Sequence, residues 1–256
     1  MKNILVIGIG AGDPEYVTIQ AVKALNKVDV FFILDKGESK HKLIELRREI
    51  CERYIDTKNY RFAEAVTPER VRGVADYQAS VNDLNREKQD VYERLITDEL
   101  EDGECGAFLV WGDPSLYDST IRILGDILDS GRAVFEFEVI PGITSVQALT
   151  ARHKIPLNRI GRSVEITTGR KLANGLSANA DTTVVMLDAE MAFKAIDNQD
   201  MDIYWGAYIG TPDEILVSGK LKDVAENIEH ARRNAREKNG WIMDTYLLRE
   251  SDESKT

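Results

Sequence analysis

The apolar run at the start of the chain constrains the fold more than any other feature of the sequence. A strand is predicted over residues 2–9, where this run passes directly into the glycine-rich segment 8–12. A strand without polar alternation is buried on both faces, which is typical of a parallel sheet covered by helices. Thr18 is expected to cap a helix, and residues 30–34 indicate a second buried strand. The chain therefore begins as a βαβ unit and is predicted to be an α/β protein.

Strand and helix patterns continue to alternate along the rest of the chain. A break at residues 155–159, which contain Pro156, predicts a domain boundary. We expect an N-terminal α/β domain with a parallel sheet over 1–154, a C-terminal α/β domain over 155–249 and a flexible tail over 250–256. Helices are expected at 38–54, 77–100, 118–130, from 144, at 189–198 and at 222–238, and further strands at 107–111, 134–140, 163–168, 182–187, 203–209, 214–218 and 241–248.

Composition limits the classes of function. The 33 basic and 44 acidic side chains give a net charge of -11, which argues against a nucleic-acid partner. Without a long apolar segment or a signal sequence, the chain is expected to be cytoplasmic and to have no membrane partner. The two cysteines indicate neither a disulfide framework nor a metal site. Basic residues cluster between Lys36 and Arg53, so binding of an anionic ligand is still possible.

The first glycine-rich loop, residues 8–14, follows a strand and precedes a helix. That setting is shared with dinucleotide-binding loops, but Asp13 stands where their third glycine belongs. The carboxylate of Asp13 and the missing N–H of Pro14 are poorly suited to a pyrophosphate. The loop therefore favours a ligand without phosphates, or a tight turn in which the glycines serve only the backbone.

Two further loops follow predicted strands, at residues 111–117 and 141–145. Ligands of open α/β sheets bind at the carboxyl ends of the strands, so the three loops are expected to converge on one crevice. Gly112-Asp113-Pro114 repeats the motif Gly12-Asp13-Pro14. Asp113 is expected to make a polar contact to a ligand, although an aspartate before a helix also commonly acts as a cap.

Taken in order, these segments resemble the tetrapyrrole (corrin and porphyrin) methylases. Two positions depart from the usual family pattern: Ala11 replaces a proline, and Leu187 stands where many relatives have methionine. Both changes keep the loop or the apolar contact. The resemblance rests on residues 6–14 with Thr18 and Ala21, Asp29-Val30, residues 112–117, 141–145 and 155–157, and residues 210–214.

The resemblance implies two α/β domains of the tetrapyrrole methylase type with an active site in the crevice between them, and a homodimer. It implies S-adenosylmethionine as the cofactor and S-adenosylhomocysteine as its product. No metal site is implied. The residues that match the family's cofactor-binding positions are Ala11, Gly112, Asp113, Leu116, Thr144, Ser145, Leu187, Ala207 and Gly210.

Residues 31–38 and 46–54 resemble one branch of the family, which acts in aerobic cobalamin synthesis on a small tetrapyrrole. That branch converts precorrin-5 to precorrin-6A by methylating ring carbon C1, with release of acetate. Acetate release requires an activated water, and Asp35 at the end of the second strand is the expected base, with Glu38 and His41 as alternatives. Lys36, Arg47 and Arg48 could bind the carboxylates of the substrate, although such a charged helix is more often only a solvated face.

Three other functions stay open at this stage. A methylase of the same fold could act on another corrinoid carbon, on ribosomal RNA ribose or on a translation-factor residue. An oxidoreductase that binds NAD through the glycine-rich turn is disfavoured because the third glycine is missing. A corrinoid-binding protein without turnover is the remaining alternative.

Overall fold

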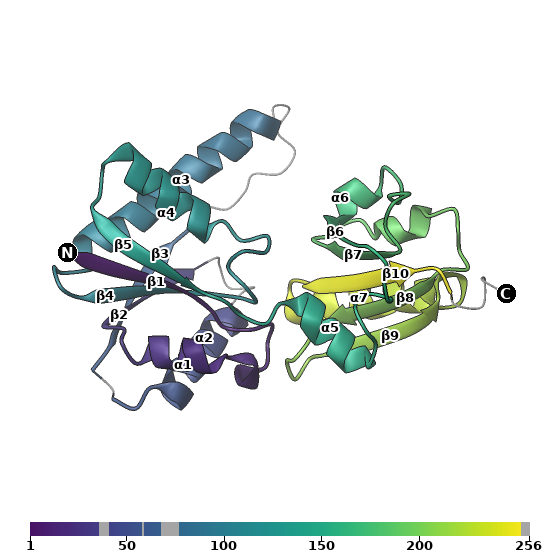
Figure 1. The fold of residues 1–256 in the computed structure, drawn as a ribbon, viewed down its shortest axis with the longest axis horizontal. Helices are drawn as coiled ribbons and strands as arrows, with labels where there is room; N and C mark the ends of the chain where they lie inside the picture. Colours follow the sequence, from purple (N-terminus) through teal and green to yellow (C-terminus); the bar gives the residue numbers. More distant parts are fainter. Residues whose placement is uncertain (36–40, 58, 68–76, 252–256) are drawn as a thin grey trace. The chain divides into compact units, whose positions relative to one another are not determined.

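The computed structural model describes residues 1–35, 41–57, 59–67 and 77–251, with the side chains of residues 35, 41 and 77–83 outside that description. The chain divides into two compact units (Figure 1). Unit 1 comprises Met1–Gly10 and Pro14–Thr144, and unit 2 comprises Ala11–Asp13 and Ser145–Thr256. Each unit is built around one five-stranded sheet, as the predicted pair of α/β domains requires.

The sheet of unit 1 is parallel throughout and has the order β3-β2-β4-β1-β5. Helices α1 and α2 cover one face, and α3 and α4 cover the other (Figure 1). Thr18 caps α1 as expected, because its hydroxyl accepts the N–H of Ala21 at 3.0 Å. The elements are β1 (Lys2–Gly8), the short helix η1 (Pro14–Tyr16), α1 (Ile19–Leu25), β2 (Val30–Asp35), α2 (His41–Tyr54), β3 (Arg61–Val66), α3 (Tyr77–Asp98), β4 (Cys105–Val110), α4 (Thr120–Ser130) and β5 (Phe135–Ile140).

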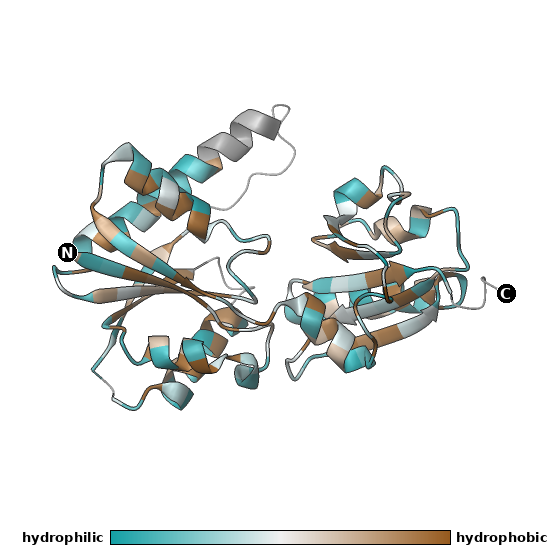
Figure 2. Cartoon of the chain, in the orientation of Figure 1, coloured by the Kyte–Doolittle hydropathy of each residue, from teal (hydrophilic) through white to brown (hydrophobic). Residues whose placement is uncertain are grey.

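The opening strand is apolar because its two faces enter different cores. Ile4 and Val6 pack in the core beneath α3 and α4, whereas Leu5 and Ile7 pack in the core beneath α1 and α2. Successive side chains of a strand point to opposite faces, so burial on both faces removes any polar alternation. In Figure 2 strand β1 is hydrophilic at its start and hydrophobic beyond it, while the helices carry both colours.

Strands β2 and β4 are paired over only part of their length. Their register runs from Val30 opposite Gly106 to Phe32 opposite Phe108. Both strands continue beyond this point, β2 alongside β3 and β4 alongside β1. The sheet therefore opens between the carboxyl ends of β2 and β4.

Unit 2 contains a mixed sheet of order β6-β7-β10-β8-β9. Only β6 and β7 are parallel neighbours, while β10 is antiparallel to both β7 and β8, and β8 is antiparallel to β9. Its core gathers Trp205, Tyr246 and Phe193. The elements are α5 (Ser145–His153), β6 (Val164–Thr168), α6 (Gly169–Leu172), β7 (Thr182–Met186), the short helix η3 (Ala192–Ala195), β8 (Asp202–Ala207), β9 (Ile215–Lys220), α7 (Leu221–Asn239) and β10 (Asp244–Arg249).

The break between the units lies at Thr144 and Ser145, ten residues before the expected boundary between 154 and 155. Helix α5 fills this interval and packs on β8, β9 and β10 of unit 2. At the other end, the expected tail begins with two residues that are held in place. Arg159 donates to the carbonyl of Glu250, and Ser251 is buried and donates to the carbonyl of Asp200 at 3.2 Å.

Two local predictions differ from the structure. The predicted helix over 189–198 is wrong, because only the short turn η3 forms there. Met191 has a left-handed backbone at its start, and the carboxylate of Asp188 accepts the N–H of Ala192 at 2.7 Å. Strand β3 was not predicted, because its exposed edge position gives an alternating sequence with little apolar character.

Candidate functional site

Three glycines pack backbone against backbone at the carboxyl edge of the unit 1 sheet. Gly8, Gly112 and Gly142 belong to β1 and to the loops after β4 and β5, which are neighbouring strands. A Cβ on Gly142 would lie 2.1 Å from the carbonyl oxygen of Gly112, and a Cβ on Gly8 would lie 2.6 Å from the nitrogen of Gly142. A side chain on Gly8 or Gly142 would therefore push the loops apart. The structure thus brings together the three loops that the sequence predicts to converge.

A short backbone bridge joins the first and second loops. Gly10 and Gly112 exchange hydrogen bonds, of 3.3 Å from the N–H of Gly10 and 2.8 Å from the N–H of Gly112. Both have left-handed backbones, with φ of 82° and 71°. Glycine is required at these positions for conformation, as the sequence suggested for the first loop.

Asp113 connects the loops after β4 and β5. One carboxylate oxygen accepts the N–H of Gly142 at 2.8 Å, and the other accepts the N–H of Ser115 at 2.8 Å and the Ser115 hydroxyl. Burial raises the pKa of Asp113, but these hydrogen bonds outweigh it and hold the pKa below its ordinary value. Asp113 is therefore an ionised brace for the loops, and its contact with a ligand stays a prediction.

The other predicted cofactor residues of unit 1 lie beside this brace. Leu116 is partly buried, and its N–H is bonded to the carbonyl of Asp113 at 3.2 Å. The Cα of Thr144 would lie 3.7 Å from a Cβ on Gly112. Ser145 follows directly and is the first residue of α5 in unit 2.

In unit 2, Leu187 directly follows β7, and Ala207 is the last residue of β8. The carboxyl ends of these two strands lie at the same edge of the sheet. Strands β7 and β8 are both antiparallel to β10, so they run in the same direction. Ala207 is fully buried, whereas Leu187 is 67% exposed and has a left-handed backbone with φ of 54°. An exposed leucine in a costly conformation at a strand end is typical of a ligand contact.

The segment around Ala11 packs with the loop after β8. A Cβ on Gly12 would lie only 2.3 Å from the carbonyl oxygen of Ile209. Gly210 has φ of 80°, and its N–H donates to Glu214 at 2.8 Å. Unit 2 therefore gathers Ala11 and Gly210, and it places Leu187 and Ala207 along one edge of its sheet.

A buried charged network supports that edge and was not predicted. Asp188, the residue after Leu187, accepts the hydroxyl of Tyr246 at 2.6 Å. Arg232 donates to the carbonyl of Asp188 at 2.7 Å and to the carboxylate of Asp244 at 3.0 Å. Burial raises the pKa of Asp244, while the charge of Arg232 acts in the opposite direction. Such a network rigidifies the strand ends that carry the predicted cofactor residues.

The residues predicted to act on the substrate are only partly described. Asp35 ends β2, but its side chain, that of His41, and all of Lys36 and Glu38 lie outside the described residues. Their roles stay predictions.

The two predicted arginines of α2 have different surroundings. Arg47 donates from Nε to the carbonyl of Leu109 at 2.9 Å, and burial lowers its pKa. Arg48 pairs with Glu64 and lies over the ring of Phe62, 4.3 Å from its centroid. The guanidinium of Arg48 packs against β3, so it is not simply part of a solvated face. Its predicted contact with the substrate stays a prediction.

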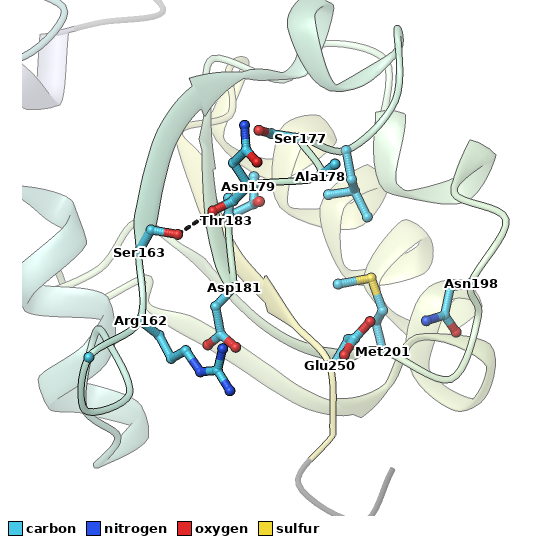
Figure 3. A pocket seen from close by; sticks show the side chains of 13 residues that line it. Arg162, Ser163, Ser177, Ala178, Asn179, Asp181, Thr183, Asn198, Met201 and Glu250 are labelled. Carbon is cyan, nitrogen blue, oxygen red and sulfur yellow. Dashed lines mark hydrogen bonds between the residues drawn. The ribbon is translucent and has the colours of Figure 1, made fainter. Parts of the chain in front are cut away.

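One pocket of about 590 Å³ lies elsewhere in unit 2. Arg162, Ser163, Asp181 and Glu250 line it with other residues (Figure 3). Ser163 and Asp181 stand just before β6 and β7, at the opposite edge of the sheet from Leu187 and Ala207. It contains none of the predicted site residues, so we place the candidate site at the strand-end loops. Among the residues that the structure describes, no cluster of three or more acidic, histidine or cysteine side chains could hold a metal, and no helix is long and apolar enough to cross a membrane.

Comparisons with known proteins agree with this arrangement. The family model described as Tetrapyrrole (Corrin/Porphyrin) Methylases matches residues 3–225. A Sinorhizobium protein named precorrin-6A synthase [deacetylating] is 51% identical over 249 residues, which cover 97% of this chain and 95% of that protein. The structure of a cobalamin synthesis related protein from Corynebacterium diphtheriae is 37% identical, with a TM-score of 0.84 over 98% of this chain and 100% of that chain.

A third structure has the same fold at lower identity. The uroporphyrin-III C-methyltransferase of Thermus thermophilus, complexed with S-adenosylhomocysteine, is 18% identical, with a TM-score of 0.59 and 97% of each chain covered. The chain belongs to the tetrapyrrole methylases. The Sinorhizobium protein also confirms the resemblance to the deacetylating branch that the sequence indicated.

Proposed function

We propose that this chain is an S-adenosylmethionine-dependent C-methyltransferase of aerobic cobalamin biosynthesis that converts precorrin-5 to precorrin-6A. It methylates ring carbon C1 and releases acetate. The observation that carries the proposal is the 51% identity, over nearly the whole of both chains, to the Sinorhizobium precorrin-6A synthase [deacetylating].

The charge of the strand-end loops supports this cofactor over a nucleotide with phosphates. These loops contain several aspartates and glutamates but no lysine or arginine. They comprise residues 8–18, 111–119, 141–145, 187–191 and 208–214. A pyrophosphate would meet negative charge there, whereas the sulfonium of S-adenosylmethionine is a cation. The same observation weighs against the NAD-binding alternative.

The loops also suit a ligand that contacts backbone and small side chains. Gly112, which has no Cβ, allows a close approach. Leu187 offers an exposed apolar surface, and Thr144 is only partly buried. These residues would hold the cofactor together with the other positions that the family resemblance indicates. Bound there, S-adenosylmethionine supplies an electrophilic methyl group and leaves as S-adenosylhomocysteine.

The protein's own contribution to methyl transfer is orientation in a rigid setting. Transfer from a sulfonium needs no side-chain nucleophile, so positioning of the two reactants dominates the rate enhancement. The Asp113 brace and the glycine contacts provide a fixed edge for this purpose.

Acetate release adds a second requirement. Water adds to the acetyl carbonyl, the bond from that carbon to the ring breaks with its electrons left on the ring, and acetate departs with the oxygen of the water. A base must take the proton of the water, and Asp35 stays our proposed base because β2 ends there, at the ligand edge of the sheet.

Two measurements test the proposal. S-adenosylhomocysteine is expected to raise the melting temperature of the protein, whereas NAD is not. The purified protein is expected to release acetate from precorrin-5 in the presence of S-adenosylmethionine. Stabilisation without acetate release would mean a methylase that acts on a different substrate, and no stabilisation would overturn the cofactor assignment.

We also propose that the protein works as a cytoplasmic homodimer that binds neither nucleic acid nor membranes. The net charge of -11 supports the absence of a nucleic-acid partner. Light scattering on the purified protein tests the dimer, and a monomeric mass would refute it.

A further inference from the structure

The guanidinium group of Arg47 lies in the opening of the unit 1 sheet. Backbone carbonyls alternate in direction along β4: that of Cys105 bonds to the β2 side, at Asp29, and that of Val110 bonds to the β1 side, at Ile9. The carbonyl of Leu109 therefore faces β2, one residue beyond the last paired position. Instead of an N–H of β2, it accepts the Nε–H of Arg47 at 2.9 Å.

This opening lies where the two neighbouring strands lead to opposite faces of the sheet. Strand β2 continues into α2, on the face with α1, and β4 continues into α4, on the face with α3 (Figure 1). Such a switch point, at the carboxyl ends of parallel strands, is where open α/β sheets form ligand crevices. Arg47 reaches this point from α2.

The charge of Arg47 has no counter-charge among the described residues. No described carboxylate lies within 4.0 Å, and Asp118 acts on its pKa only at longer range. Arg48, Arg53 and Arg61, by contrast, are each paired with a glutamate. A partly buried cation without a counter-charge has lost part of its hydration without compensation, so its retention calls for an explanation.

Only part of the hydrogen-bonding capacity of Arg47 is used. Nε donates to Leu109, and Nη1 donates to the carbonyl of Leu43 at 2.7 Å. In the described part of the chain no hydrogen bond involves Nη2, and the residue is only partly buried. The Nη1 and Nη2 edge of a guanidinium matches the two oxygens of a carboxylate.

We propose that Arg47 binds a carboxylate of the substrate at the carboxyl ends of β2 and β4. This proposal rests on the proposed function, since a precorrin carries acetate and propionate arms that could fill such a site. Two backbone carbonyls hold the guanidinium in place, so the arm is bound without reordering of a long side chain. Arg48, turned toward β3, has no equivalent role.

The test compares Arg47→Gln and Arg47→Lys with Arg53→Gln, a control on the same helix whose partner is Glu15. Arg47→Gln is expected to raise the KM for precorrin-5 by at least about 30-fold, because truncation of one partner leaves a carboxylate unpaired. Arg47→Lys is expected to restore part of this loss, and the Kd for S-adenosylhomocysteine is expected to stay unchanged. Fluorescence titration with uroporphyrin III, whose carboxylate arms are free, provides a second measure.

The outcomes separate this inference from the proposed function. An unchanged KM and porphyrin affinity in Arg47→Gln would overturn the carboxylate site. Equal losses of porphyrin and S-adenosylhomocysteine binding, with a lower melting temperature, would mean that Arg47 only ties α2 to β4 and would also overturn it. Wild-type protein that binds S-adenosylhomocysteine poorly or releases no acetate would count against the proposed function instead.

Discussion

The contact between Gly142 and Gly112 makes a single added methyl group informative. In Gly142→Ala the new Cβ would start 2.1 Å from the Gly112 carbonyl oxygen and 2.9 Å from the backbone of Gly8. Backbone must then move by roughly 1 Å to reach ordinary van der Waals contact, since no flexible side chain can yield. The movement strains the bridge between Gly10 and Gly112 and the hydrogen bond from Gly142 to Asp113.

The expected cost follows from these contacts. Overpacking of a rigid site costs about 1–3 kcal/mol, and a weakened hydrogen bond adds about 1 kcal/mol. A loss of roughly 2–4 kcal/mol corresponds to a melting temperature lower by roughly 5–15 °C for a chain of this size. Affinity for S-adenosylhomocysteine is expected to fall as well, because the displaced carbonyl belongs to a predicted cofactor residue.

Differential scanning fluorimetry with and without S-adenosylhomocysteine measures both effects. Gly125→Ala provides a matched control, because Gly125 lies within α4 and a Cβ there meets nothing within 4 Å. That variant is expected to be more stable by about 0.5–1 kcal/mol. If Gly142→Ala melted and bound ligand like the wild type, the close packing of the three loops would be refuted.

Three other predictions use different parts of the chain. Leu187→Gly is expected to relieve about 1 kcal/mol of left-handed strain yet to weaken S-adenosylhomocysteine binding roughly 10-fold; a lower melting temperature with unchanged affinity would contradict this. Arg61 lowers the pKa of Glu104 from 4.5 to about 2, so the pair stabilises the fold above pH 4.5 and loses this effect as the pH falls toward 2. Between pH 4.5 and 2 the melting temperature of Glu104→Gln should therefore fall less steeply with decreasing pH than that of the wild type. An equally steep fall in both proteins would count against the pairing. Burial raises the pKa of Cys51 to about 12 and that of Cys105 to about 11, so a thiol reagent at mildly alkaline pH should label both slowly until urea is added; rapid labelling of the native protein would show that they are accessible.

The fold was largely predictable because its strands are buried in a periodic way. The strand over 2–9 could be recognised since its side chains enter two cores in turn. Strand β3 could not, because its edge position leaves Glu64 and Val66 exposed and weakens the apolar signal. The false helix at 189–198 has a helical pattern of apolar residues, but the left-handed backbone at Met191 overrides it.

The candidate site was predictable where glycines and the family pattern mark it, and less so where charge is buried. Arg47 and Arg48 are adjacent in the sequence, and only the structure shows that a turn of about 100° sends one into the sheet and the other toward β3. Arg232 stands beside Arg233 on a charged helix, so its burial could not be inferred from composition.

The assignment of Ala11–Asp13 to unit 2 has a consequence for protein engineering. These three residues lie early in the chain, yet Gly12 packs on the carbonyl of Ile209, almost two hundred residues later in the sequence. A fragment that starts at Ser145 would lack this piece of its own unit. For the same reason, a chimera with a single crossover at residue 145 would pack residues 11–13 of one parent against unit 2 of the other. A chimera in which the donor of the C-terminal half also supplies residues 11–13 would keep each unit intact.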